Sequence, residues 1–162
     1  MDITITPVTA ENAEIAGRII YDAWGETYRG LMPDDVLDGR SLERCVGRAR
    51  ENCGNYRLAF ADGEAAGTVA VLPQAREFCT HADSGEIVAL YVLKRFQRQG
   101  VGKALVKAAA DALGRDKITL FVLKGNDNAA WFYKAMGFEF TGKELCENGM
   151  TDLEMIYFKR KK

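Results

Sequence analysis

The chain has few of the residues that build a metal site or a disulfide framework. Its four cysteines form no C-x-x-C pair, and His81 is the single histidine. This inventory cannot supply the ligands of a Cys/His zinc site, so no metal is expected. Free thiols, and residues 1–8 that do not read as a secretion signal, favour a reducing, cytoplasmic location. We expect the cysteines to be small buried hydrophobic residues rather than nucleophiles.

The sequence also lacks an excess of charge and a long apolar run. Lysine and arginine number 22 against 23 acidic residues, a net charge of −1. The basic surplus of a non-specific nucleic-acid binder is therefore missing. The longest uncharged apolar run, residues 87–93, is far too short to cross a bilayer. Neither nucleic acid nor a membrane is expected as a partner.

Prolines number only three, and no Pro- or Ser-rich linker or internal repeat divides the 162 residues. At about 150 residues per domain, this length indicates a single domain over residues 1–162. Hydrophobic residues make up 48% of the chain, which is ordinary for a globular protein. A domain of this size buries about 70% of the surface of its unfolded chain, and it needs no disulfide or metal to fold.

Hydrophobic periodicity predicts about seven strands and four longer helices. The strand-like segments are residues 3–6, 56–61, 65–72, 86–93, 118–123, 138–145 and 151–158. The helical segments are residues 9–24, 42–52, 100–113 and 127–136, with one short helical turn from Pro33. Asp62-Gly63 and Asn148-Gly149 are typical of tight hairpin turns. In the first helix Ile15, Ile19, Ile20 and Ala23 are expected on one face, and the basic tail 159–162 is expected to be solvated.

A strand–helix–strand unit flanked by hairpins predicts a mixed α/β (α+β) fold. Parallel strands need a crossover helix, whereas the hairpins pair antiparallel. We therefore expect one mixed, twisted sheet of about seven strands, with helices on both faces.

The stretch from Glu86 to Lys103 carries the strongest functional signal. A strand runs into a turn with Gly100 and Gly102, where a helix begins. A helix start leaves unpaired N–H groups with positive partial charge, and glycine lets a ligand approach them, as phosphate binding requires. Cations surround the turn: Lys94, Arg95, Arg98 and Lys103. Neither a P-loop nor a dinucleotide fingerprint fits, and a capped helix on a solvated basic surface is the alternative.

The segment Gln97-Arg98-Gln99-Gly100-Val101-Gly102 resembles the Q/R-x-x-G-x-G/A pyrophosphate loop of the GNAT superfamily of N-acetyltransferases. Residues 126–138, with Asn126, Ala129, Phe132-Tyr133 and Gly137-Phe138, are similar to that family's N-x-x-A-x-x-F-Y-x-x-x-G-F segment. Two such motifs in register are a specific signal, and the order of elements agrees along the whole chain.

The resemblance implies a GNAT-type acyltransferase fold whose fourth strand splays from the fifth and opens a central cleft. It implies acetyl-CoA as the acyl-donor cosubstrate. The backbone of Leu90 and Val92 would receive the pantetheine arm, Asn126 would orient it, and Phe132 would pack against it. The full set implied for the cofactor is Leu90, Tyr91, Val92, Gln97, Arg98, Gln99, Gly100, Val101, Gly102, Lys103, Asn126 and Phe132.

The expected reaction is direct transfer to a primary amine in a ternary complex. Tyr133 is implied beside the thioester sulfur, where its hydroxyl could protonate the departing thiolate. A lysine-like amine is about six pKa units above a free Glu, so direct deprotonation by Glu86 is uphill by roughly 8 kcal/mol. A water chain positioned by Glu86 is the cheaper route. His81 is a further candidate, although a loop histidine is more often solvated.

Acceptor specificity in this family comes from the segment between the first two helices and from the last hairpin. Here that implies Trp24, Tyr28 and Leu31, beside the acidic residues Glu26, Asp34, Asp35 and Asp38. An acidic, aromatic mouth suits a cationic amine, and a solvated acidic loop is the alternative. A polyamine, an amino acid, an aminoglycoside and a protein N-terminus all stay open, as does a homodimer. The competing function is a non-catalytic acyl-CoA-binding or sensing domain.

Overall fold

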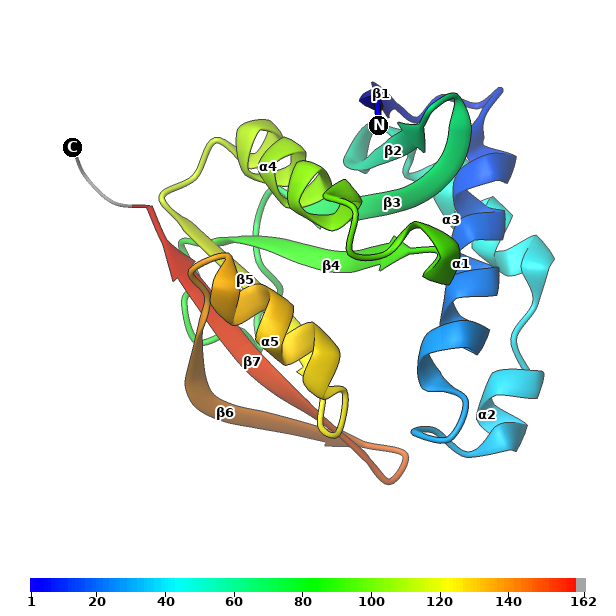
Figure 1. The fold of residues 1–162 in the computed structure, drawn as a ribbon. Coiled ribbons are helices and arrows are strands. Elements are labelled where there is room, and N and C mark those ends of the chain that lie inside the picture. Colours follow the sequence, from blue (N-terminus) through cyan, green and yellow to red (C-terminus); the bar gives the residue numbers. More distant parts are fainter. Residues whose placement is uncertain (160–162) are drawn as a thin grey trace. The chain divides into compact units, whose positions relative to one another are not determined.

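The computed structural model describes residues 1–159 as a mixed α/β fold (Figure 1). The strands are β1 Ile3–Pro7, β2 Tyr56–Ala61, β3 Glu64–Leu72, β4 Gly85–Val92, β5 Lys117–Leu123, β6 Glu139–Glu147 and β7 Met150–Phe158. The α-helices are α1 Ala13–Tyr28, α2 Asp34–Asp38, α3 Leu42–Glu51, α4 Val101–Leu113 and α5 Asp127–Ala135. Two 3₁₀ helices, η1 Cys53–Asn55 and η2 Lys94–Phe96, complete the fold. The part of the basic tail at 160–162 lies outside the described residues.

The strands follow the order β1-β2-β3-β4-β5-β7-β6, which confirms the seven-stranded mixed sheet. β4 pairs with β5 in parallel, while β1–β2, β2–β3, β5–β7 and β6–β7 are antiparallel. Both predicted hairpin turns are present. Asp62 and Gly63 have φ of 49° and 84°, and Asn148 and Gly149 have 52° and 76°. Positive φ at both turn positions matches the twist of the paired strands.

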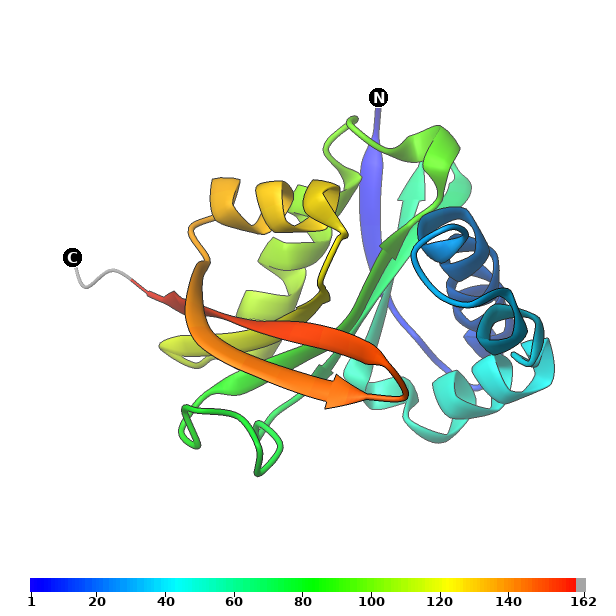
Figure 2. The same cartoon turned by 90° about the horizontal axis from the view of Figure 1, so that it is seen from below.

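The chain divides into two compact units, one of residues 1–70 and 89–112, the other of residues 71–88 with the chain from Leu113 onward. In the first unit, Tyr56, Leu58 and Ala70 share a core with the buried face of α1. The opposite face of these strands contacts α4, because a Cβ on Gly67 would meet Leu105 at 3.0 Å. Helices therefore cover both faces of these strands, as Figures 1 and 2 show.

Helix α1 differs from the predicted range 9–24 at both ends and in its buried face, and it begins only at Ala13. It continues past Trp24 to Tyr28, and the chain turns away only at Gly30, which has a left-handed φ of 90°. The buried positions are Ala13, Ala16, Gly17, Ile19 and Ala23, while Ile15 is 38% exposed. Small residues on this face allow a close approach, and Ile15 falls at its edge.

Gly17 provides a test of this close packing between α1 and α3. A Cβ at Gly17 would lie 2.5 Å from the Cα of Val46, whereas a Cβ at Gly25 of the same helix would meet nothing within 4 Å. Gly17→Ala is expected to cost about 1–3 kcal/mol because the backbone must shift. At about 2–4 °C per kcal/mol, thermal unfolding should show a lower Tm.

The matched control is Gly25→Ala, which is expected to be neutral or stabilising by up to about 1 kcal/mol, since alanine is the better helix former. Equal Tm values for the two variants would contradict the packing described between α1 and α3.

In the second unit, α5 lies over β5 and β7 (Figure 1). Its buried residue Tyr133 packs edge-on against Phe138, with ring centroids 5.6 Å apart, and Phe138 packs against Tyr157 at 5.4 Å. Gly137 has φ of 102° and ends the helix as predicted. A Cβ there would lie 3.2 Å from the Tyr157 ring, so the turn also packs closely on β7. The position of Tyr133 is thus fixed by its contact with Phe138 and by the end of α5 at Gly137.

The prediction of four buried cysteines is correct only for Cys79. Cys146 is exposed on β6, and Cys45 and Cys53 are half-buried; all four are free thiols. Alternation along the outer strand β6 turns Cys146 to solvent, a placement that composition does not reveal. Within residues 1–159, every helix is too short or too polar for a membrane span.

Candidate functional site

The turn before α4 contains two residues with left-handed backbone conformations. Arg98 and Gly100 both adopt left-handed conformations, with φ of 61° and 91°. The chain then enters α4 at Val101, and the Ala104 N–H donates to the Gly100 carbonyl at 3.1 Å as the first bond of the helix. The N–H groups of residues 101–103, in the first turn of α4, have no carbonyl of the same helix four residues earlier to which they could donate. These donors and the helix dipole suit a diphosphate.

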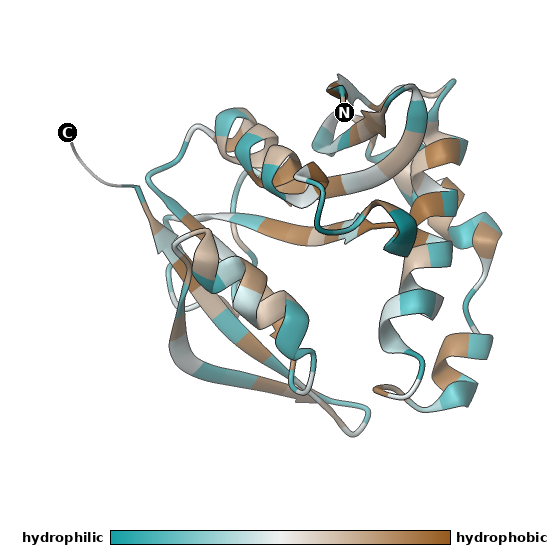
Figure 3. Cartoon of the chain, in the orientation of Figure 1, coloured by the Kyte–Doolittle hydropathy of each residue, from teal (hydrophilic) through white to brown (hydrophobic). Residues whose placement is uncertain are grey.

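Two glutamine side chains of the motif brace this turn. Gln97 Nε2 donates to the Val92 carbonyl at 3.1 Å, and Gln99 Nε2 donates to the Arg95 carbonyl at 3.1 Å. Arg98 and Lys103 are exposed beside them, and Figure 3 shows the segment between β4 and α4 as largely hydrophilic. The backbone N–H groups and the exposed cations of this turn therefore fit a diphosphate. The two glutamine side chains stabilise the turn through their hydrogen bonds to its backbone.

The last residues of β4 join the predicted acceptor residues in one aromatic cluster. The ring centroids of Trp24 and Tyr28 lie 4.9 Å apart, and Tyr91 lies 6.4 Å from Trp24 and 6.3 Å from Tyr28. The hydroxyls of Tyr28 and Tyr91 are 3.3 Å apart. The sequence prediction assigned Tyr91 to the cofactor and the other two to the acceptor, and the structure brings all three together.

The predicted acidic mouth is partly neutralised. Arg29 pairs with Asp34 at 3.2 Å and with Asp38 at 3.1 Å. The Glu26 carboxylate accepts from the Lys94 N–H at 3.1 Å, which ties α1 to η2. The Arg40 guanidinium lies 4.1 Å from the Trp24 ring centroid. Since these cations lie among the carboxylates, negative charge alone does not define this surface.

Leu31 lies in the turn after α1 and is 42% exposed, with its N–H donating to the Tyr28 carbonyl at 2.8 Å. It is not among the rings that form the aromatic cluster. Its predicted acceptor role rests on the segment it belongs to and stays a prediction.

On α5, Asn126 caps the helix and Tyr133 is buried. Asn126 Oδ1 accepts from the Ala129 N–H at 3.4 Å. Phe132 packs edge-on against Tyr133 with ring centroids 5.1 Å apart. These residues of the motif therefore cap α5 and pack within it. The proposed roles of Asn126 and Phe132 toward the cofactor, and of Tyr133 in catalysis, stay predictions.

Glu86 is fully buried and tightly paired. Its Oε1 accepts from the Arg76 N–H and Nε, each at 3.1 Å, and from Cys79 Sγ at 3.4 Å. Its Oε2 accepts from Arg76 Nε at 3.0 Å and from Nη2. The sequence did not predict Arg76 as the partner of Glu86. It lies ten residues earlier in an irregular segment, and no local pattern marks such a residue as an ion-pair partner. The proton-transfer role of Glu86 stays a prediction.

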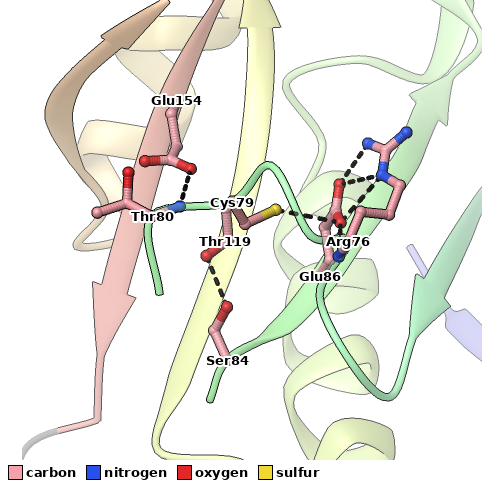
Figure 4. A network of polar contacts seen from close by, with 7 residues as sticks. All are labelled: Arg76, Cys79, Thr80, Ser84, Glu86, Thr119 and Glu154. Carbon is pink, nitrogen blue, oxygen red and sulfur yellow. Dashed lines mark hydrogen bonds and ion pairs between the residues drawn. The ribbon is translucent and has the colours of Figure 1, made fainter. Parts of the chain in front are cut away.

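The segment between β3 and β4 is held down by a wider polar network (Figure 4). The Thr80 N–H donates to Glu154 at 2.9 Å, and the Thr141 hydroxyl donates to the same carboxylate at 2.6 Å. The buried hydroxyls of Ser84 and Thr119 are 2.8 Å apart. Each buried polar side chain of this network thus has a partner, and such pairing keeps a buried polar network from destabilising the fold.

Cys79 and His81 belong to the same segment; Cys79 is not set up for nucleophilic catalysis, and a role of His81 stays a prediction. Burial, together with the charge of Glu86, raises the pKa of the Cys79 thiol to about 12, so it is not a nucleophile. The His81 ring packs edge-on against Phe158, with centroids 5.5 Å apart, and its carbonyl accepts from Ser84. In the described part of the chain, no cluster of His, Cys, Asp and Glu could hold a metal ion.

Comparisons with known proteins agree with these two motifs. Residues 41–158 match the family model of the acetyltransferase (GNAT) domain. The chain is 26% identical over 161 residues, 91% of each protein, to YuaI of Bacillus subtilis (strain 168), an uncharacterised N-acetyltransferase. Its fold resembles PaiA N-acetyltransferase from Thermoplasma acidophilum, solved in complex with coenzyme A, with a TM-score of 0.75 and 21% identity over 98% of this chain and 99% of that chain. A GNAT-family acetyltransferase from Bacillus cereus gives a TM-score of 0.75 at 13% identity, covering 99% and 100%.

Proposed function

Because the chain belongs to the GNAT acetyltransferase family, we propose that it transfers an acetyl group from acetyl-CoA to a primary amine of a small molecule or peptide. The observation that carries the proposal is the turn before α4, whose left-handed Arg98 and Gly100 lead into a helix start beside exposed cations. The coenzyme A complex of the PaiA enzyme supports the choice of donor. The family match includes residues of both compact units, which supports a single functional domain.

Acetyl-CoA would be held by the backbone as much as by side chains. The N–H groups at the start of α4, residues 100–103, would bind the diphosphate, with Arg98 and Lys103 adding positive charge. Leu90 and Val92 would offer backbone groups to the pantetheine arm in the manner of an added strand. Asn126 and Phe132 would contact the same arm. When bound, acetyl-CoA supplies the acetyl group as a thioester that an amine can attack.

Tyr133 is the proposed acid of the reaction. Its hydroxyl would donate a proton to the sulfur that leaves as the thioester bond breaks. A thiol near pKa 8.5 and a tyrosine near 10 make full transfer uphill by roughly 2 kcal/mol, a small cost for a positioned acid. We propose that the amine loses its proton to a water chain, with Glu86 as the predicted group that positions a water. Arg76 and Cys79 hold the Glu86 carboxylate in one orientation.

Acetyl-CoA is expected to stabilise the folded protein against heat. At about 100 times its Kd, a ligand that binds only the folded state adds roughly 2.7 kcal/mol. At about 2–4 °C per kcal/mol, the expected rise in Tm is about 5–10 °C. Differential scanning fluorimetry with acetyl-CoA, ATP and NAD at equal concentrations measures it.

ATP and NAD serve as controls because they carry phosphates but no pantetheine arm. Equal shifts with all three ligands, or no shift with acetyl-CoA, would refute the proposed donor. Release of free CoA thiol in the presence of a panel of amines then separates an enzyme from an acyl-CoA sensor, which would bind without turnover.

A further inference from the structure

The Arg76 guanidinium in the second unit is fixed on one edge and one face. The edge formed by Nε and Nη2 is bound to the Glu86 carboxylate, which has no exposed side-chain surface. The carbon of the guanidinium lies 4.6 Å from the centroid of the Phe78 ring, which in turn packs on Phe121 at 5.6 Å. A stacked and ion-paired arginine loses little further entropy when it binds a second anion.

The other edge of the same guanidinium faces outward. Within residues 1–159, Nη1 has no hydrogen-bond partner, and Figure 4 shows this nitrogen without a contact to the residues drawn. The Arg76 side chain keeps 46% of its surface exposed, although its carboxylate partner is buried. A guanidinium has two edges that can each take a carboxylate, so the open edge suits a second carboxylate.

Arg76 binds a residue within the pairing of β4 with β5. The parallel ladder covers Gly85 to Ile87 against Ile118 to Leu120, so Glu86 is its middle residue. Asp152 on β7 pairs with Leu123 of β5, past the end of this ladder. Asp152 also shares a strand face with Glu154, which binds Thr80 of the segment that carries Arg76.

The two charges influence each other, which agrees with this placement. Burial raises the pKa of Asp152, the charge of Glu147 adds to the rise, and the positive charge of Arg76 opposes it. Asp152 is half-buried, and neither a hydrogen bond nor a salt bridge joins it to Arg76 in the described residues. The second unit thus presents an anchored cation and a separate carboxylate on the same face.

We infer that Arg76 and Asp152 recognise an acceptor that carries both charges, an amine that also bears a carboxylate, such as an α-amino acid. The open edge of Arg76 binds the acceptor carboxylate, and Asp152 binds its ammonium group before deprotonation. This inference rests on the proposed function and narrows the acceptors to one class. A polyamine, which has no carboxylate, would leave the Arg76 edge unused and would place a second cation against it.

The experiment compares matched acceptors, the L-amino acids and the amines that result from removing their α-carboxyl group, for example L-phenylalanine with 2-phenylethylamine. The measured quantity is the ratio of kcat/KM within each pair, followed by CoA thiol release. The parent protein is expected to prefer the carboxylated member by at least tenfold. Glutamine has no charged pair of N–H donors with which to bind a carboxylate. In Arg76→Gln this preference should therefore fall by about tenfold.

Two further variants separate recognition from a general effect on folding or on Glu86. Arg76→Lys keeps the positive charge beside Glu86 but loses the paired N–H donors of the guanidinium. Its preference for the carboxylated acceptor should lie between those of the parent and Arg76→Gln. Asp152→Asn should raise KM for both members of a pair and leave their ratio unchanged, because both carry the ammonium group. Circular dichroism and the acetyl-CoA melting shift establish that each variant is folded and binds the donor.

Equal use of both members by the parent protein would overturn the inference while leaving N-acetyl transfer intact. The inference also fails if the protein acetylates amines that lack a carboxylate and none of the carboxylated ones. A ratio that survives in Arg76→Gln would assign the preference to other residues. Failure of the proposed function itself looks different, since no amine, with or without a carboxylate, would then be turned over, whether or not acetyl-CoA binds.

Discussion

Turnover of the Tyr133→Phe variant is expected to fall by about 10²–10⁴-fold at saturating acetyl-CoA, the usual range for a positioned acid. The substitution removes one hydroxyl and keeps the ring that packs against Phe138 and Phe132. Acetyl-CoA affinity should change little, because the hydroxyl acts on charge that develops in the transition state. Stability should change by about 1 kcal/mol for one lost hydrogen bond. Steady-state kinetics with a good amine, and calorimetric titration of acetyl-CoA, measure the two effects.

Tyr157→Phe is the matched control. It removes another tyrosine hydroxyl from the same unit, on a ring that packs against the same Phe138, and turnover should stay near that of the parent. An acyl donor with a more acidic thiol should recover part of the rate lost in Tyr133→Phe, since its thiolate needs the proton less. Near-normal turnover of Tyr133→Phe would leave Tyr133 with only its packing role.

The Gly102→Asp variant is expected to bind acetyl-CoA about 100-fold more weakly. Gly102 is the second residue of α4, in the first turn where the diphosphate is proposed to bind. Two like charges about 4 Å apart repel by about 1 kcal/mol in water and about 4 kcal/mol near a protein surface, and 100-fold lies within that range. An aspartate in the first turn favours the helix itself, so the fold should persist. Isothermal titration with acetyl-CoA gives the affinity.

Gly102→Asn separates charge from volume, because asparagine has nearly the shape of aspartate and no charge. It should bind acetyl-CoA at least tenfold more tightly than Gly102→Asp. If both variants bind acetyl-CoA as the parent does, the diphosphate binds elsewhere. Equal and large losses in both would indicate that the volume of the side chain matters, and not its charge.

Local patterns in the sequence were sufficient for most elements of the fold. Alternation and helical spacing predicted all seven strands and the longer helices, and the Asp62-Gly63 and Asn148-Gly149 pairs predicted both hairpin turns. Ser41, directly before α3, is a typical N-cap residue, and its hydroxyl accepts a hydrogen bond from the Arg44 N–H at 3.3 Å. These features depend on residues a few positions apart, so the chain near them contains all the information required.

The end of α1 at Tyr28 could not be predicted from local patterns in the sequence. Nothing between Trp24 and Tyr28 continues a strong apolar stripe, yet the last turn is stabilised by contacts with distant residues. Tyr28 meets Tyr91 of β4, and Glu26 binds the N–H of Lys94, 68 positions later in the chain. Tertiary packing thus extended a helix that its own residues favour only weakly.

The sequence by itself was enough to identify the family and to predict the donor loop and the candidate residues of α5, because each of these depends on a short motif. Only the tertiary structure decided which charges remain available. Glu86 proved to be buried against Arg76, Arg29 binds two of the four predicted acidic residues, and Glu154 binds Thr80, 74 positions away. A buried charge must find a partner wherever the fold supplies one, and long-range partners leave no trace in local periodicity. The open edge of Arg76 follows from that requirement, since one buried carboxylate occupies only half of a guanidinium.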